Sequence, residues 1–114
     1  MIDVERAMRV SVPADLDRWL RVEGATATEV VVAIIKRSTG AATVTLLELQ
    51  EVALCHGWVD TQTKRIDERW YAIRFVPRRP RSTWGPKNRA MARRLRDAGR
   101  IEPAGLRTLP PDLG

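Results

Sequence analysis

Residues 58–76, WVDTQTKRIDERWYAIRFV, decide the fold class, because they contain two alternating runs separated by a short polar stretch. One face of the first run carries Trp58, Asp60 and Gln62. One face of the second run carries Trp70, Ala72, Arg74 and Val76, and the other face carries Tyr71, Ile73 and Phe75. This alternation predicts two antiparallel strands with a turn near residues 66–68. Pro77 ends the second strand, because proline lacks the N–H that a strand ladder uses.

The segments around this hairpin complete an α+β fold. Residues 29–36, EVVVAIIK, are rich in β-branched side chains and predict a central strand. Helices are expected to begin after Pro13, at a capping box formed by Thr45 and Glu48, at Pro86 and at Pro103. Residues 1–13 form either a loose lead-in or an edge strand, and residues 108–114 form a tail. We therefore expect one α+β domain over residues 1–114, with a small, mostly antiparallel sheet of about three strands covered by three to four helices.

The positive charge of the chain is concentrated in one third of its length. The formal net charge is +6, with 13 Lys and Arg against 3 Asp and Glu between Lys64 and Arg100, and 7 against 11 elsewhere. Such asymmetry favours an anionic partner, although the acidic remainder could instead neutralise the basic segment by internal pairing. No run approaches the ~20 apolar residues of a membrane span. The single cysteine and the absence of an apolar leader predict a cytoplasmic location.

The stretch from Arg74 to Arg89, RFVPRRPRSTWGPKNR, lies at the centre of this charge. Arginine side chains match phosphate or carboxylate groups in bidentate geometry, and the helix expected at Pro86 would offer free N–H groups to an anion. The stretch predicts a site for an anionic small molecule or a phosphate-bearing ligand. The expected site residues are Trp58, Asp60, Arg74, Arg78, Arg79, Arg81, Trp84 and Asn88. The alternative is that the loop arginines pair with Asp60, Asp67 and Glu68 and hold the loop against the sheet.

The hairpin itself leaves two further interpretations open. Trp58, Asp60 and Arg74 are expected on one sheet face, where they would either hold a polar ligand or form an Asp60–Arg74 ion pair beside a core tryptophan. A small enzyme would instead use Asp60 or Asp67 as a general base beside an arginine clamp. We assign no catalytic residue and favour a binding module over an enzyme.

The helix expected after Pro86 suggests a second kind of partner. Its basic side chains recur at helical spacing and form a stripe of Lys87, Arg89, Arg93, Arg96 and Arg100. Such a stripe can follow a phosphate backbone, so nonspecific nucleic-acid binding is the alternative function. No motif for base-specific reading is present in the sequence.

Cys55 and His56 are adjacent at the end of an expected helix. Neighbours on a helix do not face each other, so the two side chains are poorly placed for proton transfer. We expect a buried, apolar cysteine and a partly exposed histidine. One cysteine and one histidine cannot supply the usual ligands of zinc, and no metal or other cofactor is expected.

The second half of the chain contains a series of short motifs at definite spacings. They are ALC at 53–55, GWVD at 57–60, PRRP at 77–80, S-x-W at 82–84, GRI at 99–101 and PAG at 103–105, with Asp67, Tyr71, Phe75 and Asn88 between them. In these motifs the chain resembles the YdeI/OmpD-associated protein family. The chain departs from the family at His56, where phenylalanine is usual, and at Gly85, where serine is usual. Members often continue into a basic helical module where this chain ends at Gly114. The resemblance implies a small bacterial protein linked to stress or antimicrobial resistance, and it assigns no chemical role to any residue.

Overall fold

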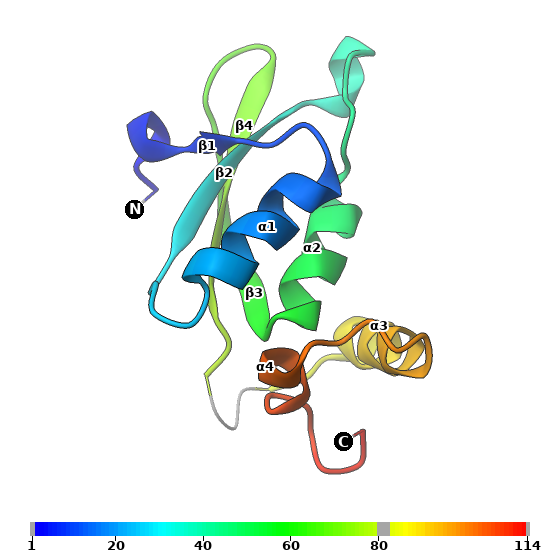
Figure 1. The fold of residues 1–114 in the computed structure, drawn as a ribbon. Helices are drawn as coiled ribbons and strands as arrows, with labels where there is room; N and C mark the ends of the chain where they lie inside the picture. The colour runs from blue at the N-terminus through cyan, green and yellow to red at the C-terminus, as the bar shows by residue number, and fades with distance from the viewer. Residues whose placement is uncertain (1, 80–82, 114) are drawn as a thin grey trace.

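The computed structural model describes residues 2–79 and 83–113. Within them, four strands form one mixed sheet in the order β1–β2–β4–β3 (Figure 1). The strands are β1 (Met8–Arg9), β2 (Val30–Ile35), β3 (Trp58–Arg65) and β4 (Trp70–Pro77). The helices are α1 (Pro13–Glu23), α2 (Leu46–Cys55), α3 (Pro86–Asp97) and α4 (Pro103–Leu106), with short 3-10 turns at η1 (Val4–Arg6) and η2 (Arg37–Thr39). The α+β class is confirmed, with one strand more than the three expected.

The additional strand is β1, which pairs parallel to β2 through Met8–Val32 and Arg9–Ala33. A parallel pair needs a long crossover connection, and α1 supplies it. Of the two interpretations of residues 1–13, the edge strand is therefore right. Two residues are too few to show an alternating pattern, so the segment carries no sequence signal of its own.

The helices α1 and α2 each begin where a carboxylate in the first turn accepts a hydrogen bond from the backbone just before the helix. Pro13 occupies the first turn of α1, and the Asp15 carboxylate accepts hydrogen bonds from the N–H groups of Ser11 (2.9 Å) and Val12 (3.3 Å). In α2 the Glu48 N–H donates to Thr45 Oγ1 (3.1 Å), and the Thr45 N–H donates back to Glu48 Oε1 (2.9 Å). The capping box expected from the sequence is confirmed.

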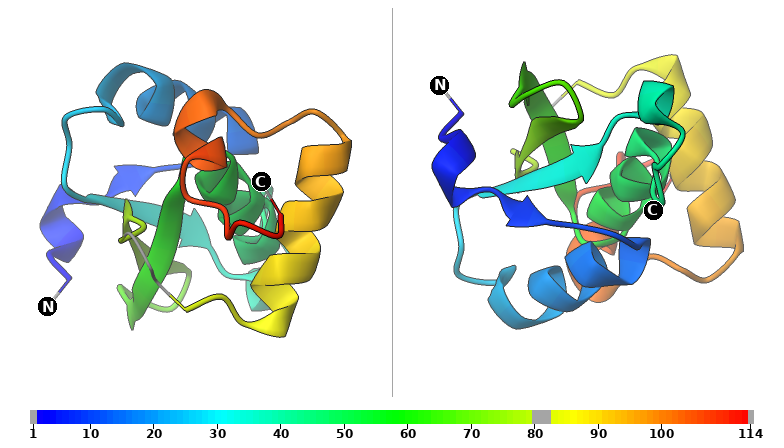
Figure 2. Two further views of the ribbon diagram at one scale, coloured as in Figure 1. Left: turned by 90° about the horizontal axis from the view of Figure 1, so that it is seen from below. Right: turned by 90° about the horizontal axis from the view of Figure 1, so that it is seen from above.

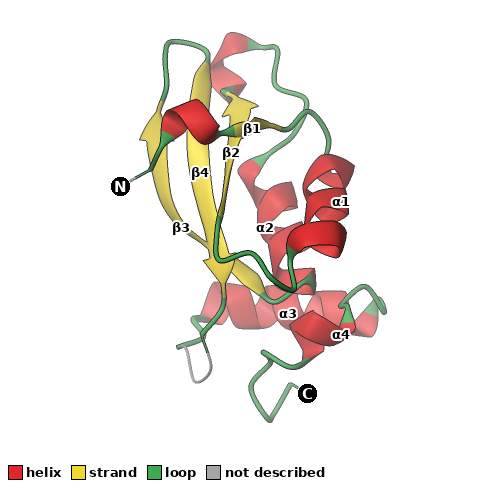
Figure 3. Ribbon diagram, turned by 60° about the vertical axis from the view of Figure 1, so that its left-hand side comes forward, coloured by secondary structure: helices red, strands yellow, loops and turns green. Residues whose placement is uncertain are grey.

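Helices α1 and α2 pack on one face of the sheet, and α3 and α4 lie across its end (Figure 3). The core between the helices and the sheet contains Leu16, Leu20, Val30, Val32, Ile34, Leu49, Val52, Ile73 and Phe75. The strand residues among them come from every second position of β2 and β4, and the others come from α1 and α2. The alternation expected for the second strand of the hairpin is therefore confirmed.

The opposite face of the sheet is covered only in part by the described residues. Val31 and Ala72 form a small buried cluster there with Ile2, which precedes η1. Farther along the same face the Arg9 guanidinium lies 4.9 Å from the centroid of the Trp70 ring. This face therefore combines a small apolar patch with cationic side chains.

A bulge in β3 changes which residues share a face. Asp60 pairs with Phe75 and Gln62 pairs with Arg74, so Thr61 is the extra residue. Trp58 and Asp60 consequently face the helices, whereas Gln62 lies on the opposite face with Arg74. The expectation that Trp58, Asp60 and Arg74 share one face is wrong, because an inserted residue reverses the alternation beyond it.

A second apolar cluster joins the end of α2 to the C-terminal third of the chain. It contains Leu54, Cys55, Met91, Ala92, Leu95, Ile101 and Leu113. The C-terminal segment runs beside α3 (Figure 2), where Leu113 is buried. Gly105 of α4 approaches the Cys55 carbonyl so closely that an ideal Cβ on it would lie 2.3 Å from the oxygen. Glycine at this position lets α4 dock directly onto the backbone of α2.

No helix within residues 2–79 and 83–113 is long and apolar enough to cross a membrane.

Candidate functional site

Arg78, which follows β4, lines two clefts. Its backbone N–H donates to the Gly57 carbonyl (2.8 Å), and its guanidinium carbon lies 4.0 Å from the centroid of the Trp84 ring. The side chain is half-buried. Burial lowers the pKa of Arg78, and the nearby Asp60 carboxylate opposes this shift in part. Arg78 is thus a positioned cation, held by backbone and aromatic contacts.

The first cleft, which we call the β3–β4 cleft, has a volume of about 530 Å³. Its lining residues are Thr28, Val59, Thr61, Arg74, Val76, Pro77, Arg78 and Arg79. Three of these residues are arginines, and none of the lining residues carries a carboxylate. Of the expected site residues, the structure therefore brings Arg74, Arg78 and Arg79 together in this cleft.

Arg74 is fixed on the wall of the β3–β4 cleft by two contacts. Its Nε donates to Glu29 Oε1 (2.7 Å), and its Nη1 donates to Thr61 Oγ1 (3.3 Å). The hydrogen bond from Arg74 lowers the pKa of Glu29, so this carboxyl stays ionised at neutral pH. The partner of Arg74 is thus Glu29 and not Asp60, which instead accepts a hydrogen bond from Gln50 Nε2 of α2 (3.2 Å).

The second cleft, which we call the α1–α4 cleft, has a volume of about 550 Å³. Its lining residues are Leu20, Arg21, Gly24, Ala25, His56, Gly57, Trp58, Pro77, Arg78, Glu102, Pro103, Ala104, Arg107 and Thr108. They come from the end of α1, the end of α2, the strand ends and α4. Pro77 and Arg78 are the two lining residues that both clefts share.

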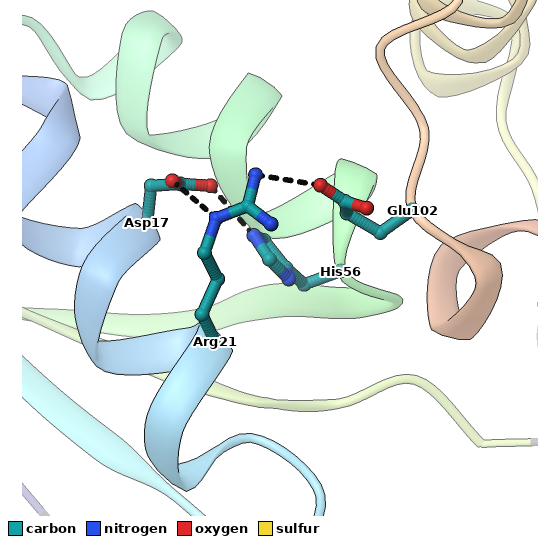
Figure 4. Close-up of polar contacts among 4 residues, drawn as sticks. All are labelled: Asp17, Arg21, His56 and Glu102. Carbon is teal, nitrogen blue, oxygen red and sulfur yellow. Dashed lines mark hydrogen bonds and ion pairs between the residues drawn. The ribbon is translucent and has the colours of Figure 1, made fainter.

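A network of four charged or polar side chains borders the α1–α4 cleft (Figure 4). His56 Nε2 lies 2.7 Å from Asp17 Oδ1, the Arg21 Nε donates to Asp17 Oδ2 (2.9 Å), and Arg21 Nη2 lies 2.6 Å from Glu102 Oε1. Burial alone would raise the pKa of Asp17, but the hydrogen bonds from His56 and Arg21 outweigh it and lower that pKa. The His56 side chain is only 7% exposed, so the expectation of a partly exposed histidine is wrong.

The other described residues of the expected anion site do not line the β3–β4 cleft, although Trp58 lines the α1–α4 cleft. Trp58 is 3% exposed and packs edge-on against Trp19, with ring centroids 5.8 Å apart. Trp84 contacts Arg78, and Asn88 is half-buried in the first turn of α3, but neither lines the two clefts. Arg81 lies outside the described residues, as does Ser82 of the resemblance.

The basic stripe on α3 is partly neutralised within the molecule. Arg89 forms an ion pair with Asp112, and Arg96 donates to the Leu113 carbonyl (2.8 Å) and pairs with Asp97 (3.0 Å). Two of the five stripe residues therefore contact acidic or carbonyl groups of the same chain. Nucleic-acid binding through Lys87, Arg89, Arg93, Arg96 and Arg100 stays a prediction.

The groups considered for catalysis have other surroundings. Cys55 is buried, as expected, and burial raises the pKa of its thiol, which disfavours the reactive thiolate. Asp67 accepts hydrogen bonds from the N–H groups of Arg69 and Trp70 (both 2.8 Å), which lower its pKa and make it a turn cap. Among residues 2–79 and 83–113 no group of three or more His, Cys, Asp and Glu side chains could hold a metal ion.

Sequence reasoning missed the polar network at the α1–α4 cleft. His56 and Asp17 are 39 positions apart, and no local spacing connects residues on different helices. The one available signal was the substitution of histidine at a position where the YdeI/OmpD-associated pattern has phenylalanine. A polar ring at the end of an apolar helix requires a partner, but the sequence alone does not name it.

The fold and the clefts define a small α+β protein with a half-covered mixed sheet and an arginine-centred pair of clefts. The chain belongs to the family described as Domain of unknown function (DUF8412), whose model matches residues 8–108. No curated protein and no solved structure matches the chain. This family match carries no functional description, and the resemblance to the YdeI/OmpD-associated family stays a prediction.

Proposed function

We propose that the protein binds a small anionic ligand in the β3–β4 cleft. The observation that carries this proposal is the composition of the lining, where Arg74, Arg78 and Arg79 share a cleft without a lining carboxylate. Guanidinium groups are planar and match the oxygen pairs of phosphate and carboxylate. A volume of about 530 Å³ suits a small molecule.

Two of the three arginines are held in place before any ligand arrives. Arg74 is fixed by Glu29 and Thr61, and the Arg78 guanidinium is held against the Trp84 ring. Side chains that become ordered on binding lose conformational entropy, which weakens binding. A site whose arginines are already ordered loses less entropy when the ligand binds. Arg79 is exposed and supplies the cation that can close over the ligand.

The proposal also includes a cellular location and a physiological role. Cys55 is buried and forms no disulfide, which is consistent with the reducing cytoplasm. The resemblance to the YdeI/OmpD-associated family would connect anion binding to stress or antimicrobial resistance.

Isothermal titration of the purified protein with pyrophosphate tests the proposal, with Arg79→Ala as the informative variant. Arg79 is exposed, so its loss should leave the melting temperature unchanged and weaken binding about tenfold or more, as expected for one charge-assisted hydrogen bond. Arg93→Ala is the matched control, because it removes another exposed cation, on α3.

The two variants separate a site from a general charge effect. Equal weakening by Arg79→Ala and Arg93→Ala would mean that net charge alone attracts the anion, which would contradict the proposal. The absence of measurable binding to pyrophosphate, inorganic phosphate and citrate would contradict it as well.

A further inference from the structure

The α1–α4 cleft contains a buried histidine with one ring nitrogen available to a ligand. His56 Nε2 is bonded to Asp17 at 2.7 Å, and the ring is 93% buried because its side chain is 7% exposed. Within residues 2–79 and 83–113, His56 Nδ1 has no hydrogen-bond partner. In the same residues, every side-chain nitrogen or oxygen atom that is fully buried does have a partner. Nδ1 must therefore be accessible, and the ring lines the α1–α4 cleft.

The bond to Asp17 determines what Nδ1 can do. A carboxylate only accepts hydrogen bonds when it is ionised, so Nε2 carries the proton in the Asp17–His56 pair. In the neutral ring Nδ1 is then an acceptor, and the second bond of Asp17 to Arg21 keeps the carboxylate oriented. Whenever the ring is neutral, the cleft thus presents one fixed acceptor that suits a hydroxyl group.

The rest of the cleft presents cations. Arg21, Arg78 and Arg107 come from three different parts of the fold and line the same space. The one lining carboxylate belongs to Glu102, which lies 2.6 Å from Arg21 Nη2 and so offsets that arginine. Arg107 is exposed at the end of α4 and is the cation best placed to engage a ligand from solvent.

We propose that the α1–α4 cleft is a second ligand site, which binds a small organic anion that also carries a hydroxyl group. The anionic group contacts Arg107 and Arg78, and the hydroxyl donates to His56 Nδ1. Leu20 and Pro77 give the cleft an apolar wall against which a short carbon chain can lie. The inference does not depend on the β3–β4 cleft, with which this site shares only Arg78 and Pro77.

A pair of probes tests the two halves of this recognition. Glycerol 3-phosphate carries an anion and hydroxyl groups, and propyl phosphate carries the same anion on a chain without them. We expect calorimetry to give about tenfold tighter binding of glycerol 3-phosphate by the wild-type protein. Equal affinity for the two compounds, or no binding of either, would overturn the proposal.

Three variants assign the contacts. His56→Gln places an amide nitrogen near the position of Nε2, so it can keep the bond to Asp17 while it removes the acceptor at Nδ1. This variant should bind both probes alike, and Arg107→Ala should weaken both about tenfold. Arg79→Ala should leave the preference for glycerol 3-phosphate over propyl phosphate unchanged, because Arg79 lines only the β3–β4 cleft. If Arg79→Ala abolishes this preference and Arg107→Ala does not, the hydroxyl-bearing anion lies in the other cleft and the proposal fails.

A second readout remains informative if His56→Gln alters the fold. In the wild-type protein, glycerol 3-phosphate should shift the amide resonances of Gly57 and Thr108, which line the cleft. Shifts confined to Thr28 and Thr61, on the walls of the β3–β4 cleft, would overturn the assignment.

Discussion

Replacing Gly105 with alanine should undock α4 from the end of α2. The added Cβ would lie 2.3 Å from the Cys55 carbonyl oxygen, 2.8 Å from the carbonyl carbon and 2.8 Å from Ile101 Cγ2. Carbon atoms in contact normally lie about 3.5–4.0 Å apart, so α4 would have to move by roughly 1 Å. Two of the three obstructing atoms belong to the backbone of α2, which cannot turn away as a flexible side chain would.

The loss of stability follows from two contributions. Forcing an additional methyl group into a close-packed contact costs about 1–3 kcal/mol. Moving α4 also breaks the hydrogen bond in which the Glu102 N–H donates to the Cys55 carbonyl (2.9 Å), which adds about 1 kcal/mol. A total of about 2–4 kcal/mol should lower the melting temperature of a chain of this length by roughly 8–16 °C.

Thermal unfolding followed by circular dichroism measures this change, and Gly85→Ala is the matched control. An ideal Cβ on Gly85 meets no atom within 4 Å, and the φ of −74° suits any residue. The control should change stability by about 0.5 kcal/mol, as expected for replacing glycine at a helix N-cap. If Gly105→Ala melts within about 3 °C of the wild type, α4 does not contact α2 as described.

Two further perturbations test the charged network and the C-terminal segment. Because the pKa of Asp17 is lowered from its ordinary value of 3.8, the stability that its bonds provide is present above that value and is lost as the pH falls through the folded-state pKa. Asp17→Asn should therefore lower the free energy of unfolding by about 1 kcal/mol at pH 7, a figure reduced because the Asp17 side chain is 35% exposed. Near pH 2 the substitution should change this free energy by nearly nothing. Urea titrations that show the same difference at both pH values would contradict this reasoning. Leu113→Ala should lower the free energy of unfolding by about 2 kcal/mol, because the Leu113 side chain is 1% exposed. The variant should also make the C-terminal segment sensitive to limited proteolysis. An unchanged urea midpoint together with unchanged cleavage would show that Leu113 does not anchor this segment.

The elements that the sequence predicts well are those specified by neighbouring residues. Proline at the first turn of α1 and of α3 marks both helix starts, and Thr45 with Glu48 marks the start of α2. The alternation in β4 correctly separates its two faces because each position depends only on the next. Local patterns therefore predict the α+β class.

The features that the sequence does not predict depend on distant pairing. Strand β1 exists because two residues find a partner in β2, and the bulge at Thr61 becomes visible only through the register of β4. The same limit applies to the site. Arg74, Arg78 and Arg79 are close in sequence and were predicted together, whereas Asp17 and His56 meet only after α1 and α2 pack side by side.

The contact between Arg78 and Trp84 gives the protein a built-in optical reporter. Indole emission depends on the charge next to the ring, and the Arg78 guanidinium lies 4.0 Å from the centre of Trp84. An anion that binds beside Arg78 in either cleft would change the electric field at this ring and so the fluorescence of this tryptophan. Trp84→Phe keeps an aromatic surface under the guanidinium and removes the signal, so the emission change can be assigned to one ring. Ligand libraries can thus be screened on the unlabelled protein.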